Sequence, residues 1–168
     1  MIVLVMGNVT TISSDTEHHR ENRQSHRPMH LRVISFGSGH SPAPKADLTV
    51  DLAEWFRDPD VSSAMRSMTA RDPEVVVSVM ETPGAHAFVE RLFTAVAVLV
   101  ELGLGTVSVA TGCVGGRHRG PVVATQLAAL ARAAGWTVEV HHRDLDKPVL
   151  ANRRAISAAD QAASRGQR

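Results

Sequence analysis

The chain has 168 residues, a formal net charge of +1 and a single cysteine. This length suits one domain with tails, and such a domain buries roughly two thirds of the surface that its unfolded chain exposes. One cysteine excludes a disulfide within the chain, and no apolar run approaches the roughly 20 residues of a membrane-spanning helix. We therefore expect a cytoplasmic protein without a membrane partner.

The distribution of charge argues against general binding of polyanions by the central part of the chain. Residues 31–150 carry 11 basic and 13 acidic side chains, whereas residues 151–168 carry four arginines and one aspartate. A generic polyanion binder usually shows a broad basic excess. Any positive site in the central part must therefore be local.

Three parts are expected along the chain. Residues 1–30 are predicted to be a disordered leader, because most of them are polar, rich in histidine and without periodicity. Met29 directly precedes the first strand-like run, so Met1 and Met29 are both candidate translation starts. We expect one α/β domain over residues 31–150 and a basic tail over residues 151–168. No metal site is expected, because no cysteine or carboxylate pattern accompanies the histidines.

The first half of the domain contains two predicted strands and one predicted helix. Residues 31–37, LRVISFG, form a short apolar run that ends in glycine, which predicts a buried strand. Residues 47–52, DLTVDL, predict a second strand. The mixed polar segment over residues 60–70 predicts a helix.

Residues 71–84 carry signals for both a strand and a helix. Their β-branched run favours a strand, whereas Pro73 suits the first position of a helix. Asp72 is expected to accept hydrogen bonds from the first free N–H groups of that helix. From these flanking residues we predict a short helix.

The second half alternates between helices and strands. Residues 85–103 show apolar side chains at helical spacing before a glycine, and residues 121–135 show the same pattern. Residues 106–112, TVSVATG, and residues 137–144, TVEVHHRD, predict strands. A strand, a helix and a strand in this order predict a right-handed parallel β–α–β unit. The predicted fold class is α/β, a single domain with a mainly parallel sheet flanked by helices.

The stretch ATGCVGGRHRG, residues 110–120, carries the densest chemistry in the chain, and we call it the glycine loop. It joins a predicted strand to a predicted helix, which is where ligands bind in open α/β sheets. Glycines allow the backbone to curl so that successive N–H groups form an anion-binding concavity. The helix N-terminus and two arginines add positive charge, so a phosphate is the expected ligand. A glycine-rich turn whose arginines face water or pair with acids is the alternative interpretation.

A second group of polar residues, HHRD, lies at the end of the last predicted strand, residues 141–144. Because the sheet is expected to be parallel, this end lies on the same edge as the glycine loop. Alternation sends His141 and Arg143 to one face and His142 to the other, so one of them should reach the pocket. A solvated strand end is the alternative. The residues predicted to bind the ligand are Thr111, Gly112, Cys113, Gly115, Gly116, Arg117, His118, Arg119, His142 and Arg143, with Ser35 and Gly37 from the first strand.

Cys113 and Arg119 also form a Cys-x5-Arg pattern that resembles the nucleophile loop of cysteine-dependent phosphatases. In that family a thiolate attacks phosphorus while the loop and the arginine hold the oxygens. Gly112 stands where that family usually has histidine, and Gly120 where it has serine or threonine. A phosphatase that uses Cys113 and Arg119 as catalytic residues is therefore the minority alternative.

The chain resembles the C-terminal domain of the RNase adapter RapZ family. That family reads approximately GCTGGKHRS where this chain reads GCVGGRHRG, and VISFG at residues 33–37 also matches. Asp47 and Asp51 fall at acidic positions of the family. His142 and Arg143, followed by Leu145 and Lys147, are similar to its ending HRTLEK. The resemblance covers about residues 31–147 and favours a helix over residues 73–81.

The resemblance implies an α/β domain similar to part of a phosphofructokinase, with a pocket for an amino-sugar phosphate or a nucleotide sugar. It also implies that the domain oligomerises, and it leaves a small-RNA-binding adapter as the second interpretation. The basic tail that follows HRTLEK in the RNA-binding branch is replaced here by PVLAN. We therefore expect a non-catalytic regulatory domain that binds a phosphorylated small molecule, without a cofactor.

Overall fold

The computed structural model describes residues 29–59 and 63–150. The predicted leader up to residue 28 and the predicted basic tail lie outside the described residues. Helices and strands occur in the order β1 (His30–Gly37), β2 (Leu48–Asp51), α1 (Pro73–Met80), α2 (Ala85–Leu99), a π-helical turn η2 (Val100–Leu104), β3 (Thr106–Cys113), α3 (Arg119–Ala133) and β4 (Thr137–His142).

The four strands form one parallel sheet in the order β2-β3-β1-β4. This confirms the predicted fold class. The central position of β1 decides which residues meet, because Ser35 is paired with Thr111 on β3 and with His142 on β4. Gly37 is paired with Cys113 at the carboxyl end of the same strands. The predicted site residues of three strands therefore share one edge.

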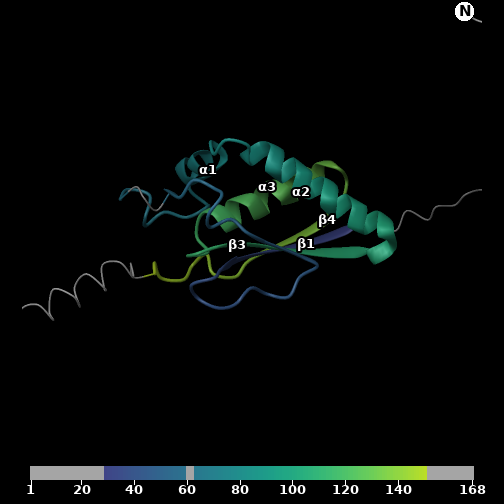
Figure 1. The fold of residues 1–168 in the computed structure, drawn as a ribbon, viewed down its shortest axis with the longest axis horizontal. Coiled ribbons are helices and arrows are strands. Elements are labelled where there is room, and N and C mark those ends of the chain that lie inside the picture. Colours follow the sequence, from purple (N-terminus) through teal and green to yellow (C-terminus); the bar gives the residue numbers. More distant parts are fainter. Residues whose placement is uncertain (1–28, 60–62, 151–168) are drawn as a thin grey trace, which may run out of the picture.

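The helices α1, α2 and α3 lie on one side of the sheet, and the connection over residues 38–47 runs along the other (Figure 1). Right-handed crossovers explain this arrangement, because β2 to β3 and β3 to β4 both advance in the same direction across the sheet. Alternate side chains of β1 and β3 point into the core under the helices. On β1 these are Leu31 and Val33, and on β3 they are Val107 and Val109. They are fully buried and belong to the same core as Val123 and Leu127 of α3.

Helix α1 confirms the prediction of a short helix after Asp72, and its two buried residues, Val75 and Val79, face the core. The predicted capping contact of Asp72 is wrong. Its carboxylate accepts from the N–H of Thr69 at 2.7 Å and from the Thr69 hydroxyl at 3.3 Å, and it makes no hydrogen bond to the helix. The side chain thus closes the turn that precedes the helix instead of the first helical turn.

The helix predicted over residues 85–103 divides into two parts. Regular α-helix ends at Leu99, and a π-helical turn continues to Leu104. Gly103 has a φ of 92°, a left-handed conformation that favours glycine, so it lies inside the turn that ends the helix. The chain then enters β3 at Thr106.

Two predicted elements differ from the structure. Residues 63–70 form turns and not the predicted helix, while residues 60–62 lie outside the described residues. The N–H of Ala70 donates to the carbonyl of Arg117 at 2.8 Å, so the glycine loop takes a hydrogen bond that a helix would have kept within itself. Strand β4 ends at His142, before Arg143 and Asp144, because these two side chains turn back toward β1. Among the described residues, no helix is long and apolar enough to cross a membrane.

Candidate functional site

Backbone contact between β1 and the glycine loop shapes the carboxyl edge of the sheet. Gly116 has a φ of 67°. A Cβ on it would lie 2.7 Å from the nitrogen of Gly37 and 2.9 Å from the Cβ of Asp144. A Cβ on Gly37 would lie 2.8 Å from the carbonyl carbon of Gly115. Only glycine allows the two main chains to approach this closely.

Gly115 differs from its neighbour, since a Cβ there would meet nothing within 4 Å. The loop is therefore packed against β1 on one side and open at Gly115.

Helix α3 begins just beyond the glycine loop, and its first helical hydrogen bond runs from the N–H of Val122 to the carbonyl of His118 at 3.0 Å. No described residue accepts a hydrogen bond from the N–H of Gly115, Gly116, Arg117, His118, Arg119 or Gly120. These N–H groups and the positive end of the helix dipole make this stretch of main chain electropositive.

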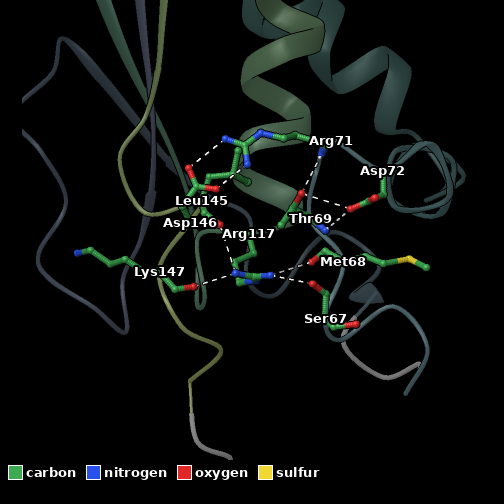
Figure 2. A network of polar contacts seen from close by, with 9 residues as sticks. All are labelled: Ser67, Met68, Thr69, Arg71, Asp72, Arg117, Leu145, Asp146 and Lys147. Atoms are coloured by element: carbon green, nitrogen blue, oxygen red, sulfur yellow. Dashed lines mark hydrogen bonds and ion pairs between the residues drawn. The ribbon is translucent and has the colours of Figure 1, made fainter.

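The guanidinium of Arg117 donates hydrogen bonds to main-chain carbonyl groups of the protein (Figure 2). One nitrogen donates to the carbonyls of Leu145 at 3.3 Å and Lys147 at 2.8 Å, and the other to those of Ser67 at 2.9 Å and Met68 at 3.5 Å. One side chain thus ties the segment before α1 to the segment after β4. Both segments are held against the glycine loop as a result.

Arg71 links the same two segments a second time. Its guanidinium binds both carboxylate oxygens of Asp146, at 2.5 and 3.0 Å (Figure 2). The hydrogen bonds and charge of Arg71 lower the pKa of Asp146, and the charge of Arg117 acts in the same direction. Both side chains of the pair are well exposed, so this ion pair contributes little to stability.

His118 and Arg119 also contact main-chain carbonyls. The Nε2 of His118 lies 3.0 Å from the carbonyl oxygen of Met68, and the ring is buried. Arg119 is buried as well and donates to the carbonyls of Ala53 and Phe56, while its other nitrogen pairs with Asp58 at 2.9 Å. The side chains of Arg117, His118 and Arg119 therefore have partners within the protein, and their contact with a ligand stays a prediction.

Asp144 is a fully buried carboxylate that lies beneath the loop. It accepts from the N–H of Gly37 at 2.7 Å and from Arg143 at 2.6 and 2.9 Å, and Lys147 lies 2.7 Å from its other oxygen. Burial opposes ionisation, but these hydrogen bonds and the charge of Arg143 hold the pKa of Asp144 far below its ordinary value. Asp144 therefore carries a charge that fixes the end of β1 against the turn after β4.

Arg143 completes this arrangement on the side of the sheet opposite the helices. Besides Asp144, it donates to the carbonyls of Pro42 at 2.7 Å, Ser41 at 3.2 Å and Gly37 at 3.3 Å. Its guanidinium carbon lies 5.5 Å from the centre of the Phe36 ring. These contacts hold Arg143 against the turn that follows β1.

His142 lies on the helix side of the sheet, next to Ser35. The Ser35 hydroxyl and the Nδ1 of His142 are 2.8 Å apart. Burial lowers the pKa of His142, and the positive charges of Arg71 and His141 lower it further. Thr111 faces the same side, and its hydroxyl donates to the carbonyl of Gly120 at 2.8 Å, which anchors the start of α3 to β3.

Cys113 and Arg119, the two residues of the phosphatase alternative, are both buried. Cys113 is only 2 % exposed at the end of β3. Arg119 directs its guanidinium to the segment over residues 53–58, and no hydrogen bond to Cys113 occurs among the described residues. Within the described ranges, no group of three or more histidine, cysteine or acidic side chains is placed to hold a metal.

Sequence reasoning missed the partners of the cationic side chains. The carbonyls of Ser67 and Met68 carry no sequence signal, because any residue supplies a carbonyl group. Asp144 was visible in the HHRD motif, but its contact with Gly37 depends on the pairing of β4 with β1. The Arg71–Asp146 pair joins residues 75 positions apart and shows no local pattern either.

The fold and this edge define an open parallel α/β domain whose glycine-rich loop leads from a central strand into a helix N-terminus. Residues 29–146 match the family described as the RapZ C-terminal domain. The chain belongs to this family, which confirms the resemblance seen in the sequence.

Similar proteins from several bacteria carry the name nucleotide-binding protein. One from Limosilactobacillus fermentum is 33% identical over 122 residues, which cover 70% of this chain and 42% of the relative. One from Symbiobacterium thermophilum is 34% identical over 123 residues, 71% of this chain and 40% of the relative. One from Parafrankia is 38% identical over 124 residues, 71% of this chain and 42% of the relative. The matched part of the chain thus spans about two fifths of the length of these relatives.

Proposed function

We propose that this domain is a non-catalytic regulatory module that binds the phosphoryl group of a small metabolite at the glycine loop. The observation that carries the proposal is the run of main-chain N–H groups from Gly115 to Gly120, none of which donates to another described residue. Such groups at a helix N-terminus bind phosphate through hydrogen bonds and through the helix dipole. In this proposal the main chain holds the phosphate, and the arginines shape the loop.

The local charge supports the same conclusion. Three carboxylates close to the loop each have a cationic partner, whereas the partners of Arg117 are neutral carbonyl groups. The pairs are Asp144 with Arg143 and Lys147, Asp146 with Arg71, and Asp58 with Arg119. No described carboxylate forms an ion pair with Arg117, so its charge favours an anion near the free N–H groups.

The family supplies the class of ligand. The relatives are named nucleotide-binding proteins, and the RapZ resemblance implies an amino-sugar phosphate or a nucleotide sugar. Both classes present a phosphoryl group that the loop N–H groups can bind. We propose that this chain senses such a metabolite in the cytoplasm without converting it.

The test uses the open position at Gly115, where a side chain fits without disturbing the fold. Gly115→Asp places a carboxylate beside the proposed phosphate, and Gly115→Asn is the matched neutral control of nearly equal size. Two like charges about 5 Å apart repel by roughly 3 kcal/mol at an effective dielectric constant of 20. We expect Gly115→Asp to weaken the binding of glucosamine-6-phosphate at least tenfold relative to Gly115→Asn.

Binding would be measured by calorimetry, with amide chemical shifts from ¹H–¹⁵N spectra reporting the loop N–H groups directly. Shifts confined to residues 115–120 on addition of phosphate or sugar phosphate are the expected result. Equal affinity of the two variants, or shifts elsewhere on the protein, would show that the phosphate does not lie at this loop.

The two alternatives have separate tests. An RNA-binding adapter requires an affinity for structured small RNA that falls steeply with salt concentration. A phosphatase requires hydrolysis of an aryl phosphate that Cys113→Ser abolishes. The burial of Cys113 and the contacts of Arg119 with Ala53, Phe56 and Asp58 give the phosphatase less support than the binding module.

A further inference from the structure

The most exposed aromatic side chain among the described residues lies on the segment that follows β2. Trp55 is 63% exposed, whereas the second tryptophan, Trp136, is 7% exposed and packs against Phe93. A tryptophan offers a large aromatic face together with a polar N–H, which is why this residue type is enriched at interaction sites.

The ring of Trp55 is held in place despite its exposure. It contacts Phe88 edge-on, with 6.4 Å between ring centres, and Phe88 contacts the buried Phe56 in the same manner at 5.3 Å. The backbone beneath it is fixed as well. The N–H of Phe56 donates to the carbonyl of Leu52, and the N–H of Arg57 donates to the hydroxyl of Thr82 at 2.8 Å. The indole is therefore anchored by Phe88 and exposed over most of its surface.

The same segment borders the glycine loop. The N–H of Leu52 donates to the carbonyl of Gly112 at 2.8 Å, so the segment begins beside the end of β3. Arg119, three residues after Gly116, donates to the carbonyls of Ala53 and Phe56 on either side of Trp55. The arginine that opens α3 thus positions the backbone that carries the exposed ring.

We propose that Trp55 stacks against the nucleobase of a nucleotide whose phosphate is bound by the glycine loop. This inference rests on the proposed function and narrows its ligand class from phosphorylated metabolites to nucleoside phosphates. Stacking suits every base, because each has an aromatic face, and it discriminates against ligands without a planar ring.

The experiment compares two ligands that differ only in the base, AMP and ribose 5-phosphate, on the full chain. Titrations of the wild type, Trp55→Phe and Trp55→Ala by calorimetry give the preference for AMP. Val98→Ala, at another exposed apolar residue near the end of α2, is the control variant. We expect the wild type to prefer AMP about tenfold, Trp55→Phe to keep most of that preference and Trp55→Ala to lose it. The affinity for ribose 5-phosphate should stay the same in all four proteins.

Tryptophan fluorescence adds a direct readout, because the exposed Trp55 and not the buried Trp136 should be quenched by AMP. A preference for AMP that persists in Trp55→Ala overturns the inference, as does equal affinity of the wild type for both ligands. In those two cases the phosphate site at the loop still stands. If neither ligand nor inorganic phosphate binds the wild type, the proposed function fails and the inference fails with it. A change in sedimentation of Trp55→Ala without a change in AMP affinity would assign the ring to contact between copies of the chain, and would also overturn it.

Discussion

Replacement of Gly116 by alanine tests the backbone geometry on which the candidate site depends. An alanine in the left-handed region costs roughly 1–2 kcal/mol. The new Cβ would also lie 2.7 Å from the nitrogen and 2.9 Å from the Cα of Gly37, and 2.9 Å from the Cβ of Asp144. Two of these atoms belong to the main chain and cannot rotate away, so overpacking adds about 1–3 kcal/mol. We expect Gly116→Ala to lower the free energy of unfolding by about 2–5 kcal/mol.

The matched control is Gly115→Ala, one residue earlier in the same loop. A Cβ there meets nothing within 4 Å, and Gly115 is not among the glycines with positive φ. Its effect should stay within about 1 kcal/mol, because alanine mainly restricts the unfolded chain at such a position. Urea unfolding followed by circular dichroism measures both variants, with the fluorescence of Trp136 as a second probe of the core.

A difference of at least about 1 kcal/mol between the two alanine variants is the expected result. Equal stabilities would refute the reasoning, because they would mean that Gly116 does not need its left-handed conformation or that the loop does not pack on β1. Gly116→Ala should also weaken phosphate binding, since the N–H groups that follow it would move with the loop.

Three further predictions concern the polar contacts around the loop. Arg117→Lys should lower the free energy of unfolding by about 1–2 kcal/mol, because a lysine cannot fork to carbonyls on both segments, and urea unfolding measures this. Asp144 has a lowered pKa, so its stabilisation is present above the ordinary carboxyl value of about 4 and is lost as the pH falls toward its folded pKa. Asp144→Asn should therefore be less stable at pH 7 and show a flatter stability curve below pH 4, and a steep acid transition in this variant would contradict the assignment. His142 also has a lowered pKa, which favours its neutral form in the folded protein, so stability should fall as the pH drops below about 6.5. His142→Gln should remove that part of the pH dependence, and an NMR titration of the ring should give a pKa below that of an ordinary histidine.

The arginines of the loop show that one residue type can either bind an anionic ligand or form structural hydrogen bonds within the fold. Their positive charge predicts contact with an anion, yet Arg117 and Arg119 are positioned by carbonyls that lie between 28 and 66 residues away in the sequence. A guanidinium carries five N–H donors, and in both arginines main-chain carbonyls accept from several of them, while Arg119 also pairs with Asp58. In this domain the arginines give the loop its shape, and in our proposal the main chain provides the donors for phosphate.

Local pattern was enough to predict most of the secondary structure, the parallel α/β class and the family. Alternation predicted β3 and β4, helical spacing predicted α2 and α3, and the glycine loop was placed correctly between β3 and α3. These features depend on neighbours in sequence, through side-chain periodicity and the conformational freedom of glycine. The helix predicted over residues 60–70 failed over its described part, because the glycine loop takes the N–H of Ala70 as a hydrogen-bond donor.

Contacts between distant segments decided the rest. The strand order β2-β3-β1-β4 brought Ser35 to His142 and Gly37 to Asp144, in each case across 107 positions of sequence. Residue type alone did not distinguish an arginine that binds main-chain carbonyls from one that binds a ligand. Both roles use the same N–H donors of the guanidinium. That distinction follows from which segments are packed over the loop, and packing is a property of the whole folded chain.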